Sequence, residues 1–316
     1  MAWDSTPWFV GGGAQHSPEV ARLLAYAASG GAEGVVEPGD LKVSPLAVPG
    51  AGVRVLPGGV LLRNTYPGGS LQSYVGRLPV QDTPAITATG SSGGRSDLVV
   101  ARVLDPQYEG GAPSDPTDFE YMRTAVVQGV PAGTRDVAGL ALGYPAVPLA
   151  RIDLPASTGT VTAGMITDLR KVARPRSQRV VRALNNADVH TLTAAALVQW
   201  PIGAAWQIDV PAWATHAVIS AFATQVDPIW SSTATNGWLT VRLGSVQADG
   251  TVWEVRSAQD VTMTVGVGDE VEIPAGVRGT TVQAATWANR NSGNGSLRWN
   301  AGSSLILDVE FQERAS

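Results

Sequence analysis

The chain has 316 residues, a formal net charge of −5, 44% hydrophobic and only 16% charged residues, and no cysteine. Its length suggests about two domains of ~100–200 residues each, and the lack of cysteine excludes disulfides and thiolate metal sites. The N-terminus lacks the basic and apolar regions of a signal peptide, and no apolar run approaches the ~18 residues of a membrane span. We therefore expect synthesis in a cytosol and no membrane insertion.

The first element that the sequence predicts is a short helix over residues 18–28. Ser17 can cap its free N–H groups, and Pro18 suits the first helical position. From there to about residue 170, short runs rich in Val, Ile and Thr, bounded by Gly and Pro, predict strands. The run 96–105 is apolar on both faces, which predicts a central strand. The segment 106–120 is polar and predicts a surface loop.

From residue 189 onward the sequence predicts about nine short strands at a spacing of roughly 8–12 residues, which is typical of an antiparallel sandwich or jelly roll. The expected fold class is therefore all-β. An N-terminal β-rich barrel or sandwich domain with one short helix covers 1–169, and a basic linker covers 170–188. A C-terminal antiparallel, jelly-roll-like β-sandwich covers 189–316.

A cluster of basic residues lies between the two predicted domains. Residues 170–182 hold six basic side chains and no acid, whereas both flanking regions are acidic. Such a linker can hold two like-charged domains close together or bind an acidic partner. The alternative is a solvated hinge whose charge has no specific role. Nucleic-acid binding is disfavoured because the acidic domains would repel phosphate. The candidate linker or assembly residues are Arg170, Lys171, Arg174, Arg176, Arg179 and Arg182.

Eight of the ten tryptophans lie between residues 200 and 299. Trp230 and Trp287 lie in or beside polar segments that we expect to be loops, and Asn289, Arg290 and Asn291 follow Trp287. An indole ring can stack on the C–H face of a sugar, while Asn and Arg side chains bind its hydroxyl groups. These five residues are therefore a candidate glycan-binding site. Packing within the domain and contact with a neighbouring subunit are the alternatives.

No motif in the sequence predicts an enzyme. Gly90–Gly94 matches the G-x-S-x-G pattern, but a strand follows the serine where a nucleophile elbow needs a helix, so a turn is favoured. The three histidines lack metal-ligand spacing. Asp269, Glu270 and Glu272 fit a solvated turn better than a calcium site. We therefore expect no catalytic residue, no metal and no cofactor.

Five segments in the N-terminal half carry a resemblance to a known family. They are “LKVSPLAVPGAGVRVLPGGVLL” (41–62), “GRSDLVVARVLDPQYEG” (94–110), “AVVQGVPAG” (125–133), “VPLARIDLPA” (147–156) and “AGMITDLRKVA” (163–173). In this order they resemble the N-terminal domain of minor tail (baseplate-type) proteins of phages that infect actinobacteria. The resemblance covers about residues 14–174. Beyond about residue 190 the chain resembles tail-fibre jelly rolls only in general.

This resemblance implies a β-rich attachment domain followed by a variable domain that is often implicated in host-surface binding. The expected protein is a structural phage tail component of the virion, which attaches to other tail proteins by its N-terminal domain and contacts the host surface by its C-terminal domain. The low charge favours a homo-oligomer, and we expect a homotrimer. One alternative is a carbohydrate-active enzyme that degrades host wall polymer, which would need paired carboxylates about 5–9.5 Å apart. A lectin-like binding protein is the other.

Overall fold

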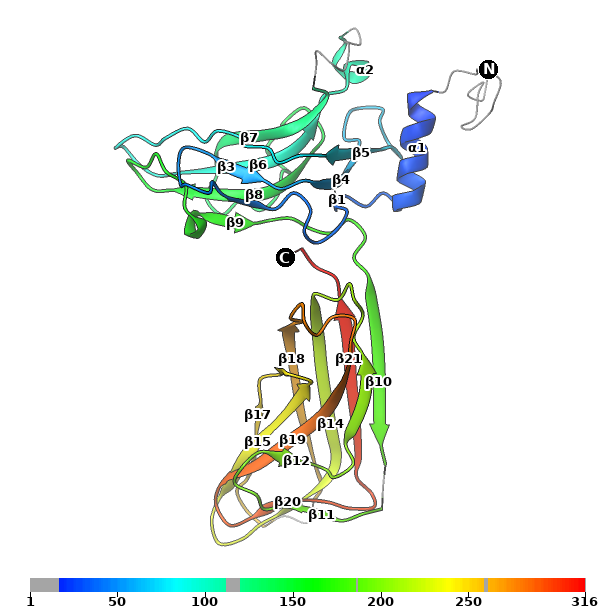
Figure 1. The fold of residues 1–316 in the computed structure, drawn as a ribbon. Helices are drawn as coiled ribbons and strands as arrows, with labels where there is room; N and C mark the ends of the chain where they lie inside the picture. Colours follow the sequence, from blue (N-terminus) through cyan, green and yellow to red (C-terminus); the bar gives the residue numbers. More distant parts are fainter. Residues whose placement is uncertain (1–16, 112–119, 186, 259–260, 316) are drawn as a thin grey trace. The chain divides into compact units, whose positions relative to one another are not determined.

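The computed structural model describes residues 17–111, 120–185, 187–258 and 261–315. The chain folds mainly into antiparallel strands and separates into two compact units, each with its own core (Figure 1). Unit 1 is Met1–Arg174 with Ala315–Ser316, and unit 2 is Pro175–Arg314. The all-β prediction is confirmed. None of the helices in the described residues has the length and apolar character needed to cross a membrane.

Unit 1 is built from short strands and a few helical turns. Its elements in chain order are α1 (Pro18–Ser29), β1 (Gly34–Val35), β2 (Val43–Pro45), β3 (Val53–Val55), β4 (Gly58–Arg63), β5 (Ser73–Leu78), β6 (Arg95–Val103), α2 (Pro106–Glu109), β7 (Met122–Val130), β8 (Ala146–Leu154), the 3-10 turn η1 (Ala163–Met165) and β9 (Ile166–Asp168). The predicted loop over 106–120 begins with the short helix α2, and its residues 112–119 lie outside the described part of the chain.

The largest sheet of unit 1 has the strand order β7-β6-β8-β9, and smaller sheets β1-β4-β5 and β2-β3 pack with it around one core. Strand β6 pairs with β7 on one side and β8 on the other, and its residues from Asp97 to Val103 are buried. The predicted central strand is therefore confirmed. Leu62 of β4 and Leu149 and Ile152 of β8 contribute to the core.

Helix α1 begins and ends as its sequence predicts. The Ser17 hydroxyl accepts a hydrogen bond from the backbone N–H of Val20 at 3.2 Å, and this cap satisfies a donor that the helix itself cannot. The buried Arg22 fixes the helix to the strands, because its guanidinium donates to Gln72 Oε1 at 2.6 Å and to Asp105 Oδ2 at 3.0 Å.

Unit 2 consists of strands joined by turns. Its elements are β10 (Ser177–Leu184), β11 (His190–Leu192), β12 (Val198–Gln199), β13 (Ala205–Asp209), β14 (His216–Ile229), β15 (Thr235–Leu243), β16 (Val246–Gln247), β17 (Thr251–Val255), β18 (Met263–Glu272), β19 (Thr281–Ser292), β20 (Ser296–Trp299) and β21 (Ser304–Gln312). One sheet has the order β10-β21-β14-β20-β11, with β18 also paired to β14. The other has the order β12-β19-β15-β16, with β13 paired to β19 and β17 to β15.

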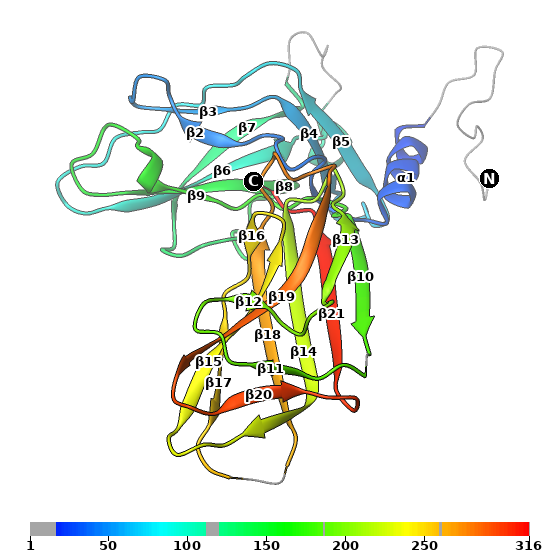
Figure 2. The ribbon, with the colours of Figure 1, turned by 60° about the horizontal axis from the view of Figure 1, so that its bottom comes forward.

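The strands of the two sheets of unit 2 can be followed in Figure 2. The two sheets enclose a single hydrophobic core. Strand β21 shows how alternation builds it: Leu305, Leu307, Val309 and Phe311 are fully buried, whereas the residues between them are not. Trp299 of β20 is also fully buried. Unit 2 is therefore the antiparallel β-sandwich that the strand spacing predicts.

The predicted basic linker over 170–188 is too long. The division between the units falls between Arg174 and Pro175, and Ser177–Leu184 is strand β10, which pairs with β21 over its whole length. Val180 and Leu184 of this strand pack against the core of unit 2. The period-two pattern of β10 is weak in the sequence, because Arg182 shares the inward face with Val180 and Leu184 while the apolar Val181 faces outward.

Separate cores predict separate unfolding transitions. Replacing Phe311 by Ala should lower the free energy of unfolding of unit 2 by about 3–5 kcal/mol, because it leaves a cavity in the core. Leu62→Ala should destabilise unit 1 by about 2–5 kcal/mol for the same reason. In differential scanning calorimetry each variant should shift one transition and leave the other in place. If both variants shift all the unfolding transitions by the same amount, the two units do not unfold independently and this prediction is wrong.

Candidate functional site

The outer face of one sheet of unit 2 carries two tryptophans. Leu239, Val241 and Leu243 of β15 lie in the core, so the residues that alternate with them face outward. In the register, Trp238 lies opposite Asn289, Thr240 opposite Trp287, and Trp238 opposite Val252 on its other side. We call the outward group the tryptophan face: Trp238, Thr240, Arg242, Val252 and Trp287.

The tryptophan face combines exposed apolar surface with fixed polar groups. Trp238 is 43% exposed and Val252 is 54% exposed. The Arg242 guanidinium carbon lies 4.4 Å from the centroid of the Trp287 ring, and Arg242 Nε donates to Gln247 Oε1 at 3.0 Å. A cation stacked on an indole and bonded at one nitrogen is held in place, while its remaining N–H groups stay available to a ligand.

The structure changes the site predicted around Trp287. Residues 287–291 are part of strand β19 and not of a loop, because pairing with β15 satisfies their backbone groups despite the low strand propensity of Asn. The Asn289 side chain is used internally: its Oδ1 accepts from the backbone N–H of Trp238 and its Nδ2 donates to the carbonyl of Ala195, both at 2.9 Å. Asn291 is exposed and donates to Asn236 Oδ1 at 3.3 Å.

Two further predicted residues lie away from the tryptophan face. Arg290 lies opposite Gly237, which pairs on its other side with the buried Trp253, so Arg290 is on the core side of the sheet. Trp230 follows β14 of the other sheet and packs against the core. The structure therefore does not bring Arg290 or Trp230 together with Trp287.

Trp238, Arg242 and Val252 were not among the site residues predicted from the sequence. A signal for two of them was present in the run 237–247, where Trp238 and Arg242 alternate with Leu239, Val241 and Leu243. Alternation places them on one face of a strand, but it does not reveal which strand brings Trp287 beside them.

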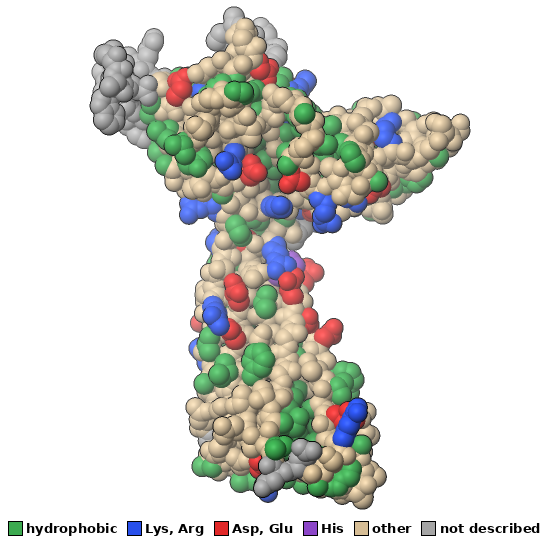
Figure 3. Space-filling view, turned by 180° about the vertical axis from the view of Figure 1, so that it is seen from behind, with side chains coloured by type: hydrophobic (Ala, Val, Ile, Leu, Met, Phe, Trp, Pro, Cys, Tyr) green, Lys and Arg blue, Asp and Glu red, His purple; other side chains and the backbone are tan. Residues whose placement is uncertain are grey.

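The other sheet of unit 2 has an exposed apolar group on its outer face. Phe222 of β14 pairs with Ile306 of β21, and these side chains are 47% and 44% exposed. Val181 of the adjacent strand β10 is 48% exposed. We call these three residues the Phe222 patch. Figure 3 shows hydrophobic side chains at the surface of both units on the side seen there, between scattered charges.

The basic residues before the division of the chain are held within unit 1. The Arg170 side chain is fully buried and donates to Asp168 Oδ2 at 2.6 Å and to the carbonyls of Pro38 and Asp40 at 2.9 and 2.7 Å. Arg174 donates to the carbonyl of Ala28 at the end of α1. Lys171 is exposed. Arg170 therefore has a structural role, because its charge and hydrogen bonds are satisfied inside the unit.

The basic residues after the division are paired within unit 2. Arg176 forms an ion pair with the buried carboxylate of Glu313, and its guanidinium carbon lies 5.6 Å from the centroid of the Trp213 ring. Arg179 Nε donates to Asp308 Oδ1 at 2.8 Å. The half-buried Arg182 donates to the carbonyl of Val181 at 3.1 Å. Pairing of β10 with β21 places Arg179 opposite Glu310 and beside Asp308, so the ion pairs of Arg176 and Arg179 give this part of the basic cluster a local explanation.

Comparison with known proteins adds little to this geometry. No protein-family model matches the chain, and no curated protein is similar to it. A structure of infectious bursal disease virus, Gx strain, has a TM-score of 0.25 at 15% identity, covering 90% of this chain and 74% of that chain. The VP2 subviral particle of the same virus gives 0.28 at 12% identity, covering 90% and 68%. A carbohydrate-binding module of the β-sandwich superfamily gives 0.15 at 12% identity, covering 89% and 100%. At TM-scores this low the similarities carry no conclusion about fold or function.

The Glu313–Arg176 pair predicts a pH-dependent contribution to stability. Burial acts to raise the pKa of Glu313, but hydrogen bonds from the side chain and backbone of Arg176 outweigh it and hold this pKa below its ordinary value. The stabilisation is therefore complete above the ordinary pKa of glutamate and is lost as the pH falls through the lowered pKa.

Glu313→Gln should reduce the free energy of unfolding at pH 7 by about 1–3 kcal/mol, because Arg176 loses a charged partner. The difference from wild type should disappear at acidic pH, where Glu313 is protonated. Urea unfolding of the variant and the wild type, repeated from pH 7 down to pH 2, measures this difference in the free energy of unfolding. The matched control is Glu254→Gln, whose exposed pairing with Arg256 should contribute about 0–1 kcal/mol. An equal loss at both ends of the pH range would contradict this role of the charge.

Proposed function

We propose that the chain is a structural component of a phage tail that attaches to other tail proteins through unit 1 and to host-surface glycan through unit 2. The order of five motifs in unit 1 supports the tail assignment, since these motifs resemble the attachment domain of minor tail proteins. The observation that carries the adhesive role is the tryptophan face of unit 2, an exposed aromatic surface on a rigid sheet.

The chemistry of the tryptophan face suits a sugar. The exposed ring of Trp238 offers a flat surface for the C–H face of a pyranose ring. Arg242 is held over Trp287, and its free N–H groups can donate to hydroxyl oxygens. Both side chains come from one strand, and strands position a site more precisely than loops do.

Two carboxylates of unit 2, Glu270 and Asp308, are poorly suited to the acid role in glycoside hydrolysis. Glycoside hydrolysis needs a carboxylic acid whose pKa is raised, so that it holds a proton near neutral pH. The hydrogen bond from Arg314 lowers the pKa of Glu270, and the hydrogen bond from Arg179 lowers that of Asp308. These carboxylates are charged at neutral pH and are poorly suited to act as general acids.

The Phe222 patch supports assembly of several copies. Phe222, Ile306 and Val181 expose apolar surface on a regular sheet, and burial of such surface favours association. We propose that this patch contributes to contacts between copies in a homo-oligomer, with three copies as the expected number.

Removal of the exposed indole should weaken adhesion. Trp238→Ala should reduce binding to purified host cell-wall glycan by about tenfold, which corresponds to about 1.4 kcal/mol, because the variant loses the apolar surface that the indole buries against the sugar ring. Isothermal titration calorimetry with soluble wall fragments measures the change. The control is Ile202→Ala, which removes an exposed apolar side chain from a turn of unit 2 and should bind as wild type does. Wild-type affinity in Trp238→Ala would refute the proposed glycan site.

Replacement of the central apolar side chain of the Phe222 patch should weaken assembly. Phe222→Ser should shift the mass in solution from the oligomer toward the single chain, since hydrophobic burial at the contact is lost. Mass photometry at several protein concentrations detects the shift, and Ile202→Ser serves as the control. If the variant and the wild type have the same mass at every concentration, the patch has no part in assembly.

A further inference from the structure

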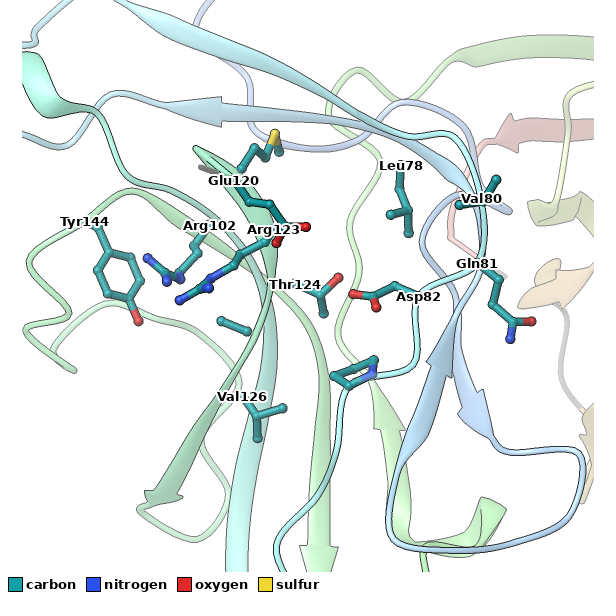
Figure 4. Close-up of a pocket in the computed structure, with 13 residues that line it drawn as sticks. Leu78, Val80, Gln81, Asp82, Arg102, Glu120, Arg123, Thr124, Val126 and Tyr144 are labelled. Atoms are coloured by element: carbon teal, nitrogen blue, oxygen red, sulfur yellow. The ribbon is translucent and has the colours of Figure 1, made fainter. Parts of the chain in front are cut away.

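Unit 1 contains a pocket beside strand β7. Its volume is about 770 Å³, and it lies between the segment 78–84 that follows β5 and the first half of β7 (Figure 4). Arg102 of β6, Arg123 of β7 and Tyr144 also line it.

Two arginines lie side by side in the pocket. Arg102 and Arg123 are directly opposite each other in the register of β6 and β7, and Figure 4 shows their guanidinium groups close together beside Tyr144. The Arg102 guanidinium carbon lies 4.9 Å from the centroid of the Tyr144 ring. Arg102 is only 7% exposed. Burial lowers the pKa of Arg102, and so does the positive charge of Arg123.

The buried Arg102 differs from the other buried arginines of unit 1. Arg22 has Asp105 as its acidic partner, and Arg170 has Asp168. Within the described residues, no ion pair with an acid is formed by Arg102 or Arg123. Like charges directly opposite each other on neighbouring strands destabilise a sheet. The charge of Glu109 favours the Arg102 cation, but a buried cation without a paired carboxylate is still costly. The arginine pair therefore does not stabilise the chain by itself, and we infer that it serves to bind an anionic group of another molecule.

The remaining walls of the pocket indicate which anion fits. Asp82 and Glu120 also line it, so a ligand with several negative charges would be repelled, whereas a single carboxylate matches the two arginines. The walls also include apolar side chains, among them Val80, Met122 and Val126.

Strand β7 offers a backbone edge at the same place. It is the terminal strand in the order β7-β6-β8-β9, and within the described residues its ladder partner is β6 alone. An edge strand presents unpaired backbone groups to which an extended peptide can add as a further strand. A peptide bound there would place alternate side chains over the pocket.

We propose that an extended segment of a partner protein pairs with the edge of β7 and places one carboxylate between Arg102 and Arg123, with apolar side chains against the pocket wall. This site deepens the attachment role proposed for unit 1 and rests on that role only for the identity of the partner. The buried Arg102 makes the site prefer a carboxylate to a neutral side chain. Only a carboxylate supplies the negative charge that stabilises a desolvated guanidinium.

The test uses the full chain and two fluorescent seven-residue peptides of alternating valine and threonine, with either aspartate or asparagine at the centre. The aspartate peptide should bind about tenfold or more tightly than the asparagine peptide, because a hydrogen bond between charged groups contributes more than a neutral one. Arg102→Gln and Arg123→Gln should each abolish this preference, whereas Arg63→Gln, at an exposed position of β4, should retain it. Fluorescence anisotropy at low and high salt measures the affinities.

Arg123 is exposed, so Arg123→Gln should fold and should keep or raise the melting temperature, since it removes a like-charge contact. If Arg102→Gln fails to fold, the peptide preference is measured with Arg123→Gln alone. Equal binding of the two peptides to the wild type, or an unchanged preference in Arg123→Gln, would overturn the site. Displacement of the aspartate peptide by inorganic phosphate at equal concentration would also overturn it, by showing a general anion site. None of these outcomes bears on glycan binding by unit 2, which the wall-fragment titration tests separately.

Discussion

Strand alternation around the core of unit 2 determines what the unit can present to other molecules. Leu239, Val241 and Ala288 must point inward, so Trp238 and Trp287 must point outward. A register slip by one residue would exchange the two sets and expose the core. The packing that stabilises the sandwich therefore also fixes the tryptophan face. The pairing of β15 with β19 brings the two tryptophans of this face together, and the pairing of β15 with β17 adds Val252.

The distribution of charge separates structural cations from those available for binding. Arg170 in unit 1 and Arg176 and Arg179 in unit 2 form ion pairs within their own units, so their clustering along the sequence needs no external partner. Arg102 and Arg123 stand apart because they face each other and neither forms an ion pair with an acid among the described residues. A short run of basic residues in a sequence therefore indicates less about partners than two arginines that lie opposite each other without an ion pair, one of them buried.

Local signals in the sequence were sufficient for some elements and misleading for others. Ser17 and Pro18 predict the start of α1 because a helix cap depends on adjacent residues. The polar residues after Trp287 suggest a loop, yet they extend β19, because distant pairing partners override weak local propensity. The stacking of Arg242 on Trp287 and the opposition of Arg102 and Arg123 are contacts between strands. Neither could be predicted without the register.

The central claim is that glycan binds on the outer face of the β15–β19 sheet. Nuclear magnetic resonance of the indole N–H groups tests it most directly. Tryptophans of unit 2 lie on the tryptophan face, in the core and beside the other sheet, so each signal reports on a different place. On titration with soluble host-wall glycan, the signals of Trp238 and Trp287 should shift with one common dissociation constant, while those of the buried Trp200 and Trp299 stay in place. Shifts confined to Trp230 or Trp213, with Trp238 unaffected, would contradict the account.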